Sequence, residues 1–106
     1  MSKYLLEITF TLQGVKGVKE KGGSDRLAAA TELVEGVGGK IESYYFAFGG
    51  IDAFVVADFP DDVSAMAVAL TVSAAGGATT RTVSLLTPAQ IDAAAKKNVK
   101  YRPPGS

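Results

Sequence analysis

Strand and helix patterns alternate along this chain in an order that few folds can accommodate. Apolar and polar residues alternate over residues 3–11, as in a half-buried strand. A helical pattern then begins at Ser24, a residue suited to capping, and a glycine-rich segment ends it. Two β-rich runs, residues 40–48 and 52–59, flank Gly49-Gly50 and predict a hairpin. The first half of the chain therefore predicts strand, helix, strand and strand.

The rest of the chain completes a second strand-helix-strand unit. Pro60-Asp61-Asp62 introduces a helix over residues 63–75, with an aspartate as its N-cap. Residues 79–86 alternate again and predict a fourth strand. Thr87 and Gln90 have the spacing of a capping box with Pro88 at the first helical position, so a short helix to about residue 97 follows.

The order β-α-β-β-α-β identifies the fold class as α+β and ferredoxin-like. Right-handed crossovers in this arrangement place both main helices on one face of a four-stranded antiparallel sheet and leave the other face open. Residues 13–23 hold four glycines and three lysines, and we interpret them as a loop that accommodates one helical turn. A chain of 106 residues is one domain. We assign residues 1–97 to it and residues 98–106 to an extended, basic, proline-rich tail.

Apolar residues exceed what one copy of this fold would bury. On the first and last strands we expect one wettable face, formed by Glu7, Thr9, Thr11, Thr80, Thr82 and Ser84, and an apolar face beneath the helices. In the second helix we expect a core stripe of Val63, Met66, Leu70 and Ala74, while Ala65, Val68, Ala69 and Val72 face other directions. Because a helix that is apolar all round packs on both sides, we predict a homo-oligomer that uses the open sheet face and this helix. The alternative is a permissive alanine-rich helix on the surface of a monomer.

Composition and charge exclude several classes of function. Eleven basic and eleven acidic residues cancel, so the net positive field that attracts nucleic acid or an anionic membrane is missing. The chain has no cysteine, which removes disulfides and thiolate chemistry, and no histidine, which removes the commonest metal ligand and the usual catalytic base. We expect no cofactor and no metal, although carboxylate metal sites are not excluded. A glutamate at position 7 interrupts the first apolar run, and we expect a cytoplasmic protein.

The basic residues are distributed unevenly along the chain. Residues 96–106 hold four basic residues and no acid, which leaves seven basic against eleven acidic residues, a charge of −4, on the rest. This tail is either solvated or an arm for an acidic partner or a neighbouring subunit.

Three residues near the hairpin and the last strand are the candidate catalytic group. Asp52 follows two glycines, where an aspartate commonly binds the turn backbone, although it could also act as a site acid or base. Arg81 lies inside a strand and requires an anionic partner, for which Asp52 and Glu7 are candidates. If Tyr45, Asp52 and Arg81 converged, they would supply an acid, a base and an anion anchor around an aromatic pocket. A core aromatic residue and an internal ion pair are the alternative interpretation.

A second set of residues could bind an anion. Lys16, Lys19 and Lys21, with Arg26 nearby, could hold a small anion near the start of the first helix, or be solvated loop charges. Together with the aromatic residues of the hairpin, the candidate ligand-binding residues are Lys16, Arg26, Tyr44, Tyr45, Asp52 and Arg81.

The hairpin region also resembles a known family. Residues 37–52 (VGGKIESYYFAFGGID), Phe59-Pro60-Asp61 and Arg81-Thr82 are similar to the GYD domain family. The Gly-Tyr-Asp signature stands here as Gly50-Ile51-Asp52, with isoleucine in place of tyrosine. The resemblance implies a ferredoxin-like fold of the dimeric α+β barrel type, in which open sheet faces pack around a cavity. Such barrels include cofactor-free oxygenases, isomerases, haem enzymes and sensors.

These observations define two hypotheses of function. The first is a homo-oligomeric module that binds a small ligand or serves in assembly, with no cofactor. The second is a cofactor-free enzyme of the oxygenase or isomerase type, acting on a small planar or anionic substrate.

Overall fold

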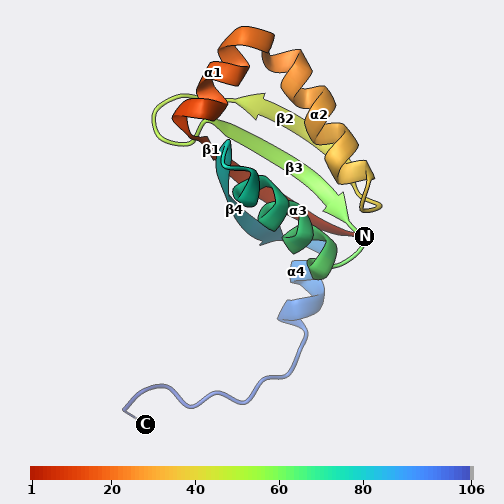
Figure 1. Cartoon of the computed structure of the whole chain (residues 1–106). Coiled ribbons are helices and arrows are strands. Elements are labelled where there is room, and N and C mark those ends of the chain that lie inside the picture. Colours follow the sequence, from red (N-terminus) through yellow and green to blue (C-terminus); the bar gives the residue numbers. More distant parts are fainter. Residues whose placement is uncertain (106) are drawn as a thin grey trace.

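The computed structural model describes residues 1–105, so Ser106 of the predicted tail lies outside the described range (Figure 1). Within that range the elements are β1 (Ser2–Phe10), α1 (Leu12–Lys21), α2 (Gly23–Glu35), β2 (Lys40–Phe46), β3 (Ala53–Phe59), α3 (Asp62–Ala75), β4 (Ala78–Leu85) and α4 (Pro88–Ala95). None of these helices has the length and apolarity that a membrane crossing requires.

The four strands form one antiparallel sheet in the order β2-β3-β1-β4. This order, with α2 and α3 as the crossover helices, confirms the α+β ferredoxin-like fold. Alternate residues of β1 and β3 face these helices and form the core together with residues of α2 and α3. The core comprises Tyr4, Leu6, Val34, Val55, Ala57, Phe59, Ala65 and Val68. The hairpin, the Asp61 N-cap of α3 and the capping box of α4 are present as predicted.

The interpretation of residues 13–23 as a loop is wrong, because Leu12–Lys21 is the helix α1. Gly14 of α1 and Gly23 at the start of α2 allow close packing. A Cβ on Gly14 would lie 1.9 Å from the carbonyl oxygen of Gly77, and a Cβ on Gly23 would lie 2.9 Å from the ring of Phe46. Thr11 caps the helix, and its hydroxyl donates to the carbonyl of Gly76 over 2.8 Å. Gly22, at φ 85°, makes the sharp turn from α1 into α2.

The two sides of α3 are exchanged relative to the prediction. Val63, Met66 and Leu70 are exposed at 78%, 55% and 63%, whereas the predicted outer residues Ala65, Val68 and Ala69 are buried. Because α3 is apolar all round, its sequence has no polar face to orient it. The small side chains of Ala65 and Ala69 face the sheet, which lets the helix approach the strands closely.

The expected wettable face of the first and last strands, β1 and β4, is also wrong. Glu7 lies opposite Arg81 and Leu5 opposite Val83, so these residues share the open face. Thr80, Thr82 and Ser84 lie instead on the helix side, opposite Ile8, Leu6 and Tyr4. The open face is therefore mixed in character, with apolar residues of all four strands between charged ones.

Ion pairs join several charges of the open face. The Lys3 Nζ lies 2.8 Å from Glu42 Oε1 and 3.1 Å from Asp58 Oδ1, and Arg81 Nε lies 3.6 Å from Glu7 Oε2. The hydrogen bonds that the Lys3 ammonium donates to Glu42 and Asp58 raise the pKa of Lys3 above its ordinary value. Phe54 and Tyr45 lie side by side among these pairs, and Tyr45 is 71% exposed.

The glycines of α1 provide a matched stability test. Gly14→Ala places a methyl group against the Gly77 carbonyl and should lower the free energy of unfolding by about 1–3 kcal/mol. Gly17→Ala, in the same helix with nothing within 4 Å of the added Cβ, should raise it by about 0.5–1 kcal/mol. Urea titration followed by circular dichroism measures both. Equal stability of the two variants would contradict the packing described for α1.

Candidate functional site

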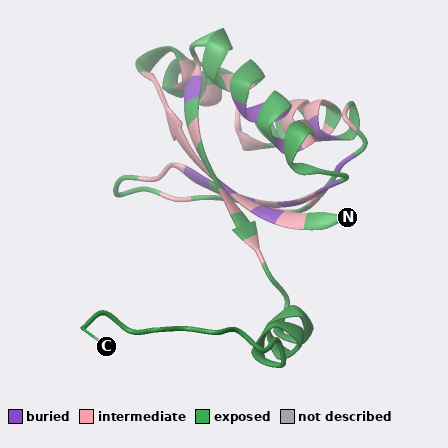
Figure 2. Ribbon diagram, turned by 90° about the horizontal axis from the view of Figure 1, so that it is seen from below, coloured by how far each residue is buried: buried purple, intermediate pink, exposed green. Residues whose placement is uncertain are grey.

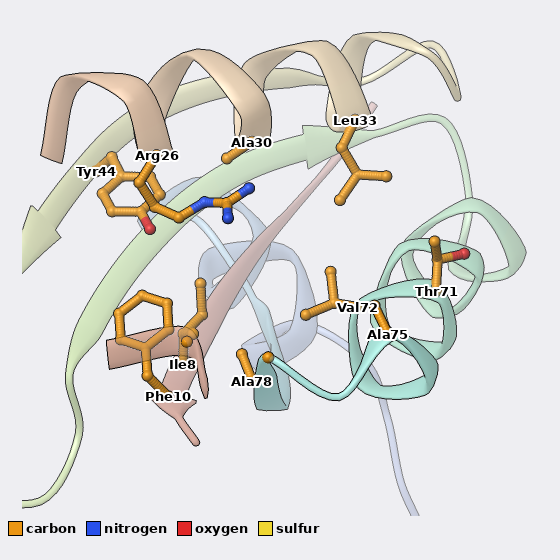
Figure 3. A pocket seen from close by; sticks show the side chains of 12 residues that line it. Ile8, Phe10, Arg26, Ala30, Leu33, Tyr44, Thr71, Val72, Ala75 and Ala78 are labelled. Carbon is orange, nitrogen blue, oxygen red and sulfur yellow. The ribbon is translucent and has the colours of Figure 1, made fainter. Parts of the chain in front are cut away.

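The two crossover helices stand over opposite edges of the sheet. α2 contacts β2, and α3 contacts β4. A cleft of about 260 Å³ therefore remains between them, above the middle of the sheet (Figure 3). This volume is close to the roughly 300 Å³ at which small-molecule sites begin.

The lining of the cleft is mainly apolar. The sheet supplies the floor, α2 and α3 the two walls, and glycines of α1 and of the turn before β4 one end. The lining residues are Ile8, Phe10, Gly14, Arg26, Ala30, Leu33, Tyr44, Thr71, Val72, Ala75, Gly77 and Ala78.

Two polar side chains reach into this apolar space from the α2 side. The guanidinium of Arg26 extends from α2, and the hydroxyl of Tyr44 comes from the neighbouring strand β2 (Figure 3). Phe46 lies next to Tyr44, with ring centroids 5.2 Å apart, and stacks on Phe10 at 6.4 Å. The aromatic contacts hold Tyr44 in place, while Arg26 makes no ion pair within residues 1–105.

Burial and charge set the protonation of Tyr44. Burial raises the pKa of its phenol above the ordinary value of 10.0, and the positive charge of Arg26 partly counteracts this effect. At neutral pH the phenol is therefore protonated and can donate a hydrogen bond. The cleft thus presents a cation and a neutral donor above an apolar floor, which suits an acceptor group with negative charge on an apolar body.

Tyr45 and Arg81 lie on the other face of the sheet. Tyr45 is opposite Phe54, Phe54 opposite Glu7, and Glu7 opposite Arg81, in one row across the four strands. Three strand spacings separate the two ends of this row, about 14 Å. The structure does not bring Tyr45 and Arg81 together within one subunit, and Arg81 has Glu7 as its anionic partner.

Asp52 forms hydrogen bonds with the backbone of β1 and of the hairpin. Its Oδ2 accepts from the backbone N–H of Phe10 over 2.8 Å. Its own N–H donates to the Ile8 carbonyl over 2.9 Å, and its carbonyl accepts from the Ala47 N–H over 2.8 Å. Asp52 therefore fixes the end of β1 to the hairpin, as an aspartate beside a turn commonly does.

The predicted anion group is divided between two helices. Lys16, Lys19 and Lys21 are exposed on α1. Arg26 belongs to α2 and turns toward the cleft (Figure 3). Of the six candidate ligand-binding residues, the structure places Arg26 and Tyr44 together in one cleft.

Comparison with known proteins identifies the family. The family model described as GYD domain matches residues 4–95. The chain belongs to the GYD domain family. No curated protein and no solved structure shows significant similarity to it. The matched range of the GYD domain includes every residue that lines the cleft and ends where α4 ends.

Most residues that line the cleft of this GYD domain could not be predicted from the sequence, because they come from segments far apart in the chain. One local signal was available in α2. Arg26, Ala30 and Leu33 follow the spacing i, i+4 and i+7, so a cation shares a helix face with small and apolar residues. The walls from α3 had no such signal, since every face of that helix is apolar.

The titration of Tyr44 tests the geometry of the cleft. In protein labelled with ¹³C-tyrosine, the Tyr44 signal, assigned with Tyr44→Phe, should titrate above 10.0. In Arg26→Gln its pKa should rise further, because the cation that stabilises the phenolate is gone. A Tyr44 pKa that is unchanged or lowered in Arg26→Gln would show that the two groups do not share the cleft.

Proposed function

We propose that this GYD domain binds a small, largely apolar anion in the cleft between α2 and α3. The observation that carries the proposal is the pair of Arg26 and Tyr44 at an apolar cleft of about 260 Å³. An apolar floor favours an aliphatic or aromatic body, and the guanidinium favours a carboxylate, with which it can form two hydrogen bonds. The Tyr44 hydroxyl supplies a third donor.

The size of the cleft limits the ligand further. The cleft volume lies near the lower end of the range for small-molecule sites, so the cleft has room for one ring or a short chain besides the anionic group of the ligand. The ligand class is therefore a small monocarboxylic acid or an equally small planar anion. The proposal places the protein in the cytoplasm, where a chain without disulfides is the norm.

Ligand binding agrees with the geometry better than the cofactor-free enzyme does. That enzyme requires Tyr45, Asp52 and Arg81 around one cavity. In one subunit Tyr45 and Arg81 occupy opposite edge strands, and Asp52 holds the backbone of Phe10. The cleft has an anion anchor and a proton donor, Arg26 and Tyr44, and its lining includes no carboxylate that could serve as a base.

Binding of a panel of small acids tests the proposed ligand class. Benzoate, phenylacetate and hexanoate should perturb the NMR signals of Tyr44 and Val72, and the matching uncharged amides should bind more weakly. Arg26→Gln should weaken carboxylate binding at least tenfold, since a hydrogen bond to a charged group contributes about 1.5–3 kcal/mol. Lys16→Gln, which removes an exposed cation of α1 outside the cleft lining, is the matched control and should bind like the wild type. Equal affinity for acids and amides would overturn the proposal.

We further propose that two copies associate through the open sheet face. Leu5, Phe54, Val56 and Val83 are only partly covered there, and ion pairs engage Lys3, Glu42, Asp58, Glu7 and Arg81 around them. Paired charges are less costly to bury than single ones, so this face can pack on a second copy. Large exposed apolar patches on proteins commonly mark interaction sites.

Light scattering with sedimentation velocity tests this association. The wild type should be a dimer or a larger assembly at micromolar concentration. Phe54→Glu introduces an unpaired charge at the centre of the open face and should shift the protein to monomer, raising the dissociation constant at least a hundredfold, because leaving a charge unpaired on burial costs about 3–5 kcal/mol. Ala28→Glu, on the exposed side of α2, should leave the assembly unchanged. A monomeric wild type would exclude the interface.

A further inference from the structure

The C-terminal part of the chain stands apart from the rest of the molecule. We define the arm as residues 86–105, all of which are exposed (Figure 2). The arm extends the molecule to 58 Å and its radius of gyration to 17.0 Å, against about 13 Å for a compact chain of this length. Its helix α4 has eight residues, none of them buried. Isolated helices below about 12–15 residues are marginal in water, so α4 requires a surface to pack on.

A short, capped connection directs the arm away from its own subunit. Only Leu86 and Thr87 separate β4 from α4. Thr87 is extended, at φ −76° and ψ 160°, and is held by the capping box with Gln90. Pro88 at the start of the helix adds a fixed φ. Figure 1 shows α4 and the following segment leaving the sheet at the end of β4, away from α1 and α2.

The body of the protein has an exposed apolar surface to match the arm. Val63, Met66 and Leu70 lie at spacing i, i+3 and i+7 on the outer side of α3, and we call them the α3 stripe. The arm carries exposed apolar residues of its own, which are Leu86, Ile91, Val99 and Tyr101. Each surface alone is exposed to water, and each would be covered by packing on the other.

Charge favours the same pairing. Glu32 and Glu35 lie in the last turn of α2, and Asp61 and Asp62 at the start of α3. These four residues form what we call the acidic end, because a Cβ on Gly38 would lie 3.3 Å from the ring of Pro60, which brings the two segments together. The α3 stripe begins there, and α3 has no basic residue. The arm carries Lys96, Lys97, Lys100 and Arg102 and one acid, Asp92.

We propose that the arm of one copy docks on the α3 stripe of a second copy, with its basic residues against the acidic end. The contact is reciprocal under two-fold symmetry, so each subunit gives one arm and receives one. Twenty residues of arm correspond to the roughly 20–30 residues that each side of a standard interface contributes. The inference rests on the proposed self-association and adds a second contact region, on the helix side of the sheet.

Zero-length cross-linking of mixed isotopes tests the docking on the full chain. Unlabelled and ¹⁵N-labelled protein are mixed, refolded together and treated with a carbodiimide, which joins amines to carboxylates in direct contact. Mass spectrometry should find Lys96, Lys97 or Lys100 joined to Glu32, Glu35 or Asp62 in pairs of mixed isotope. Cross-links confined to one isotope, or no such cross-link, would overturn the proposal.

Surface variants separate the arm contact from the sheet contact. Leu70→Glu should lower the yield of mixed cross-links at least fivefold, while the circular dichroism spectrum stays unchanged. Leu12→Glu, which also replaces an exposed leucine by a charge but lies on α1, is the control and should leave the yield unchanged. An equal yield in Leu70→Glu and wild type would exclude the α3 stripe as the docking surface.

Charge reversal gives an independent check. Lys96→Glu with Lys97→Glu should reduce docking, and adding Glu32→Lys with Glu35→Lys to the same chain should restore it. Restoration is measured by cross-links between the exchanged positions, and its failure would count against the acidic end as the receiving surface. A protein that self-associates without arm cross-links refutes the docking and keeps the sheet interface, whereas a monomer refutes both.

Discussion

Two helices can cover only one face of a four-stranded sheet, and the arrangement of this protein follows from that limit. α2 packs over β2 and α3 over β4, so each helix protects one edge strand and part of the centre. β1 and β3 bury their alternate residues beneath both helices, and Tyr4 and Phe59 meet there edge to face at 5.6 Å. The same arrangement leaves a cleft between the helices and an open face beneath the sheet. Both candidate binding surfaces are thus consequences of how the core is covered.

Local sequence patterns predicted the elements well, and long-range packing decided the rest. The strands, the hairpin, the Asp61 cap and the Thr87 capping box depend on neighbours in sequence, and all of them are present. The sequence did not predict α1, because the glycine at position 14 is required by the close approach of Gly77, which lies more than sixty residues away in the chain. The orientation of α3 was inverted because its sequence contains no polar face. Sequence patterns indicate which face is buried only where the faces differ in polarity.

In the candidate site, too, local patterns indicated the residues and long-range packing decided which of them meet. Arg26 and Tyr44 were both recognised as residues that could bind a ligand, but their meeting depends on the packing of α2 against β2. The alternation of Tyr44 and Tyr45 along β2 places neighbouring tyrosines on opposite faces, so at most one of them can serve each surface. The strand order then places two strands, β3 and β1, between Tyr45 and Arg81. Within a regular stretch of strand, whether two residues share a face is fixed by the parity of their positions, but the bulge between Ile41 and Ser43 shifts that parity in β2. The separation of residues on different strands is fixed by strand order, which the chain does not show locally.

The helix α3 belongs to both surfaces on its side of the sheet. Its inner side supplies Val72 and Ala75 to the cleft, and its outer side carries Met66 and Leu70. Ala65 and Ala69 hold it to the strands through small contacts, which constrain a helix less than interlocked large side chains do. An arm packed on the outer side would fix the position of the wall that the cleft shares. By thermodynamic reciprocity, a ligand that favours that position of α3 must strengthen docking by the same factor by which docking strengthens its own binding. If the cleft binds its ligand and the arm docks as proposed, the two events are coupled to the extent that α3 moves.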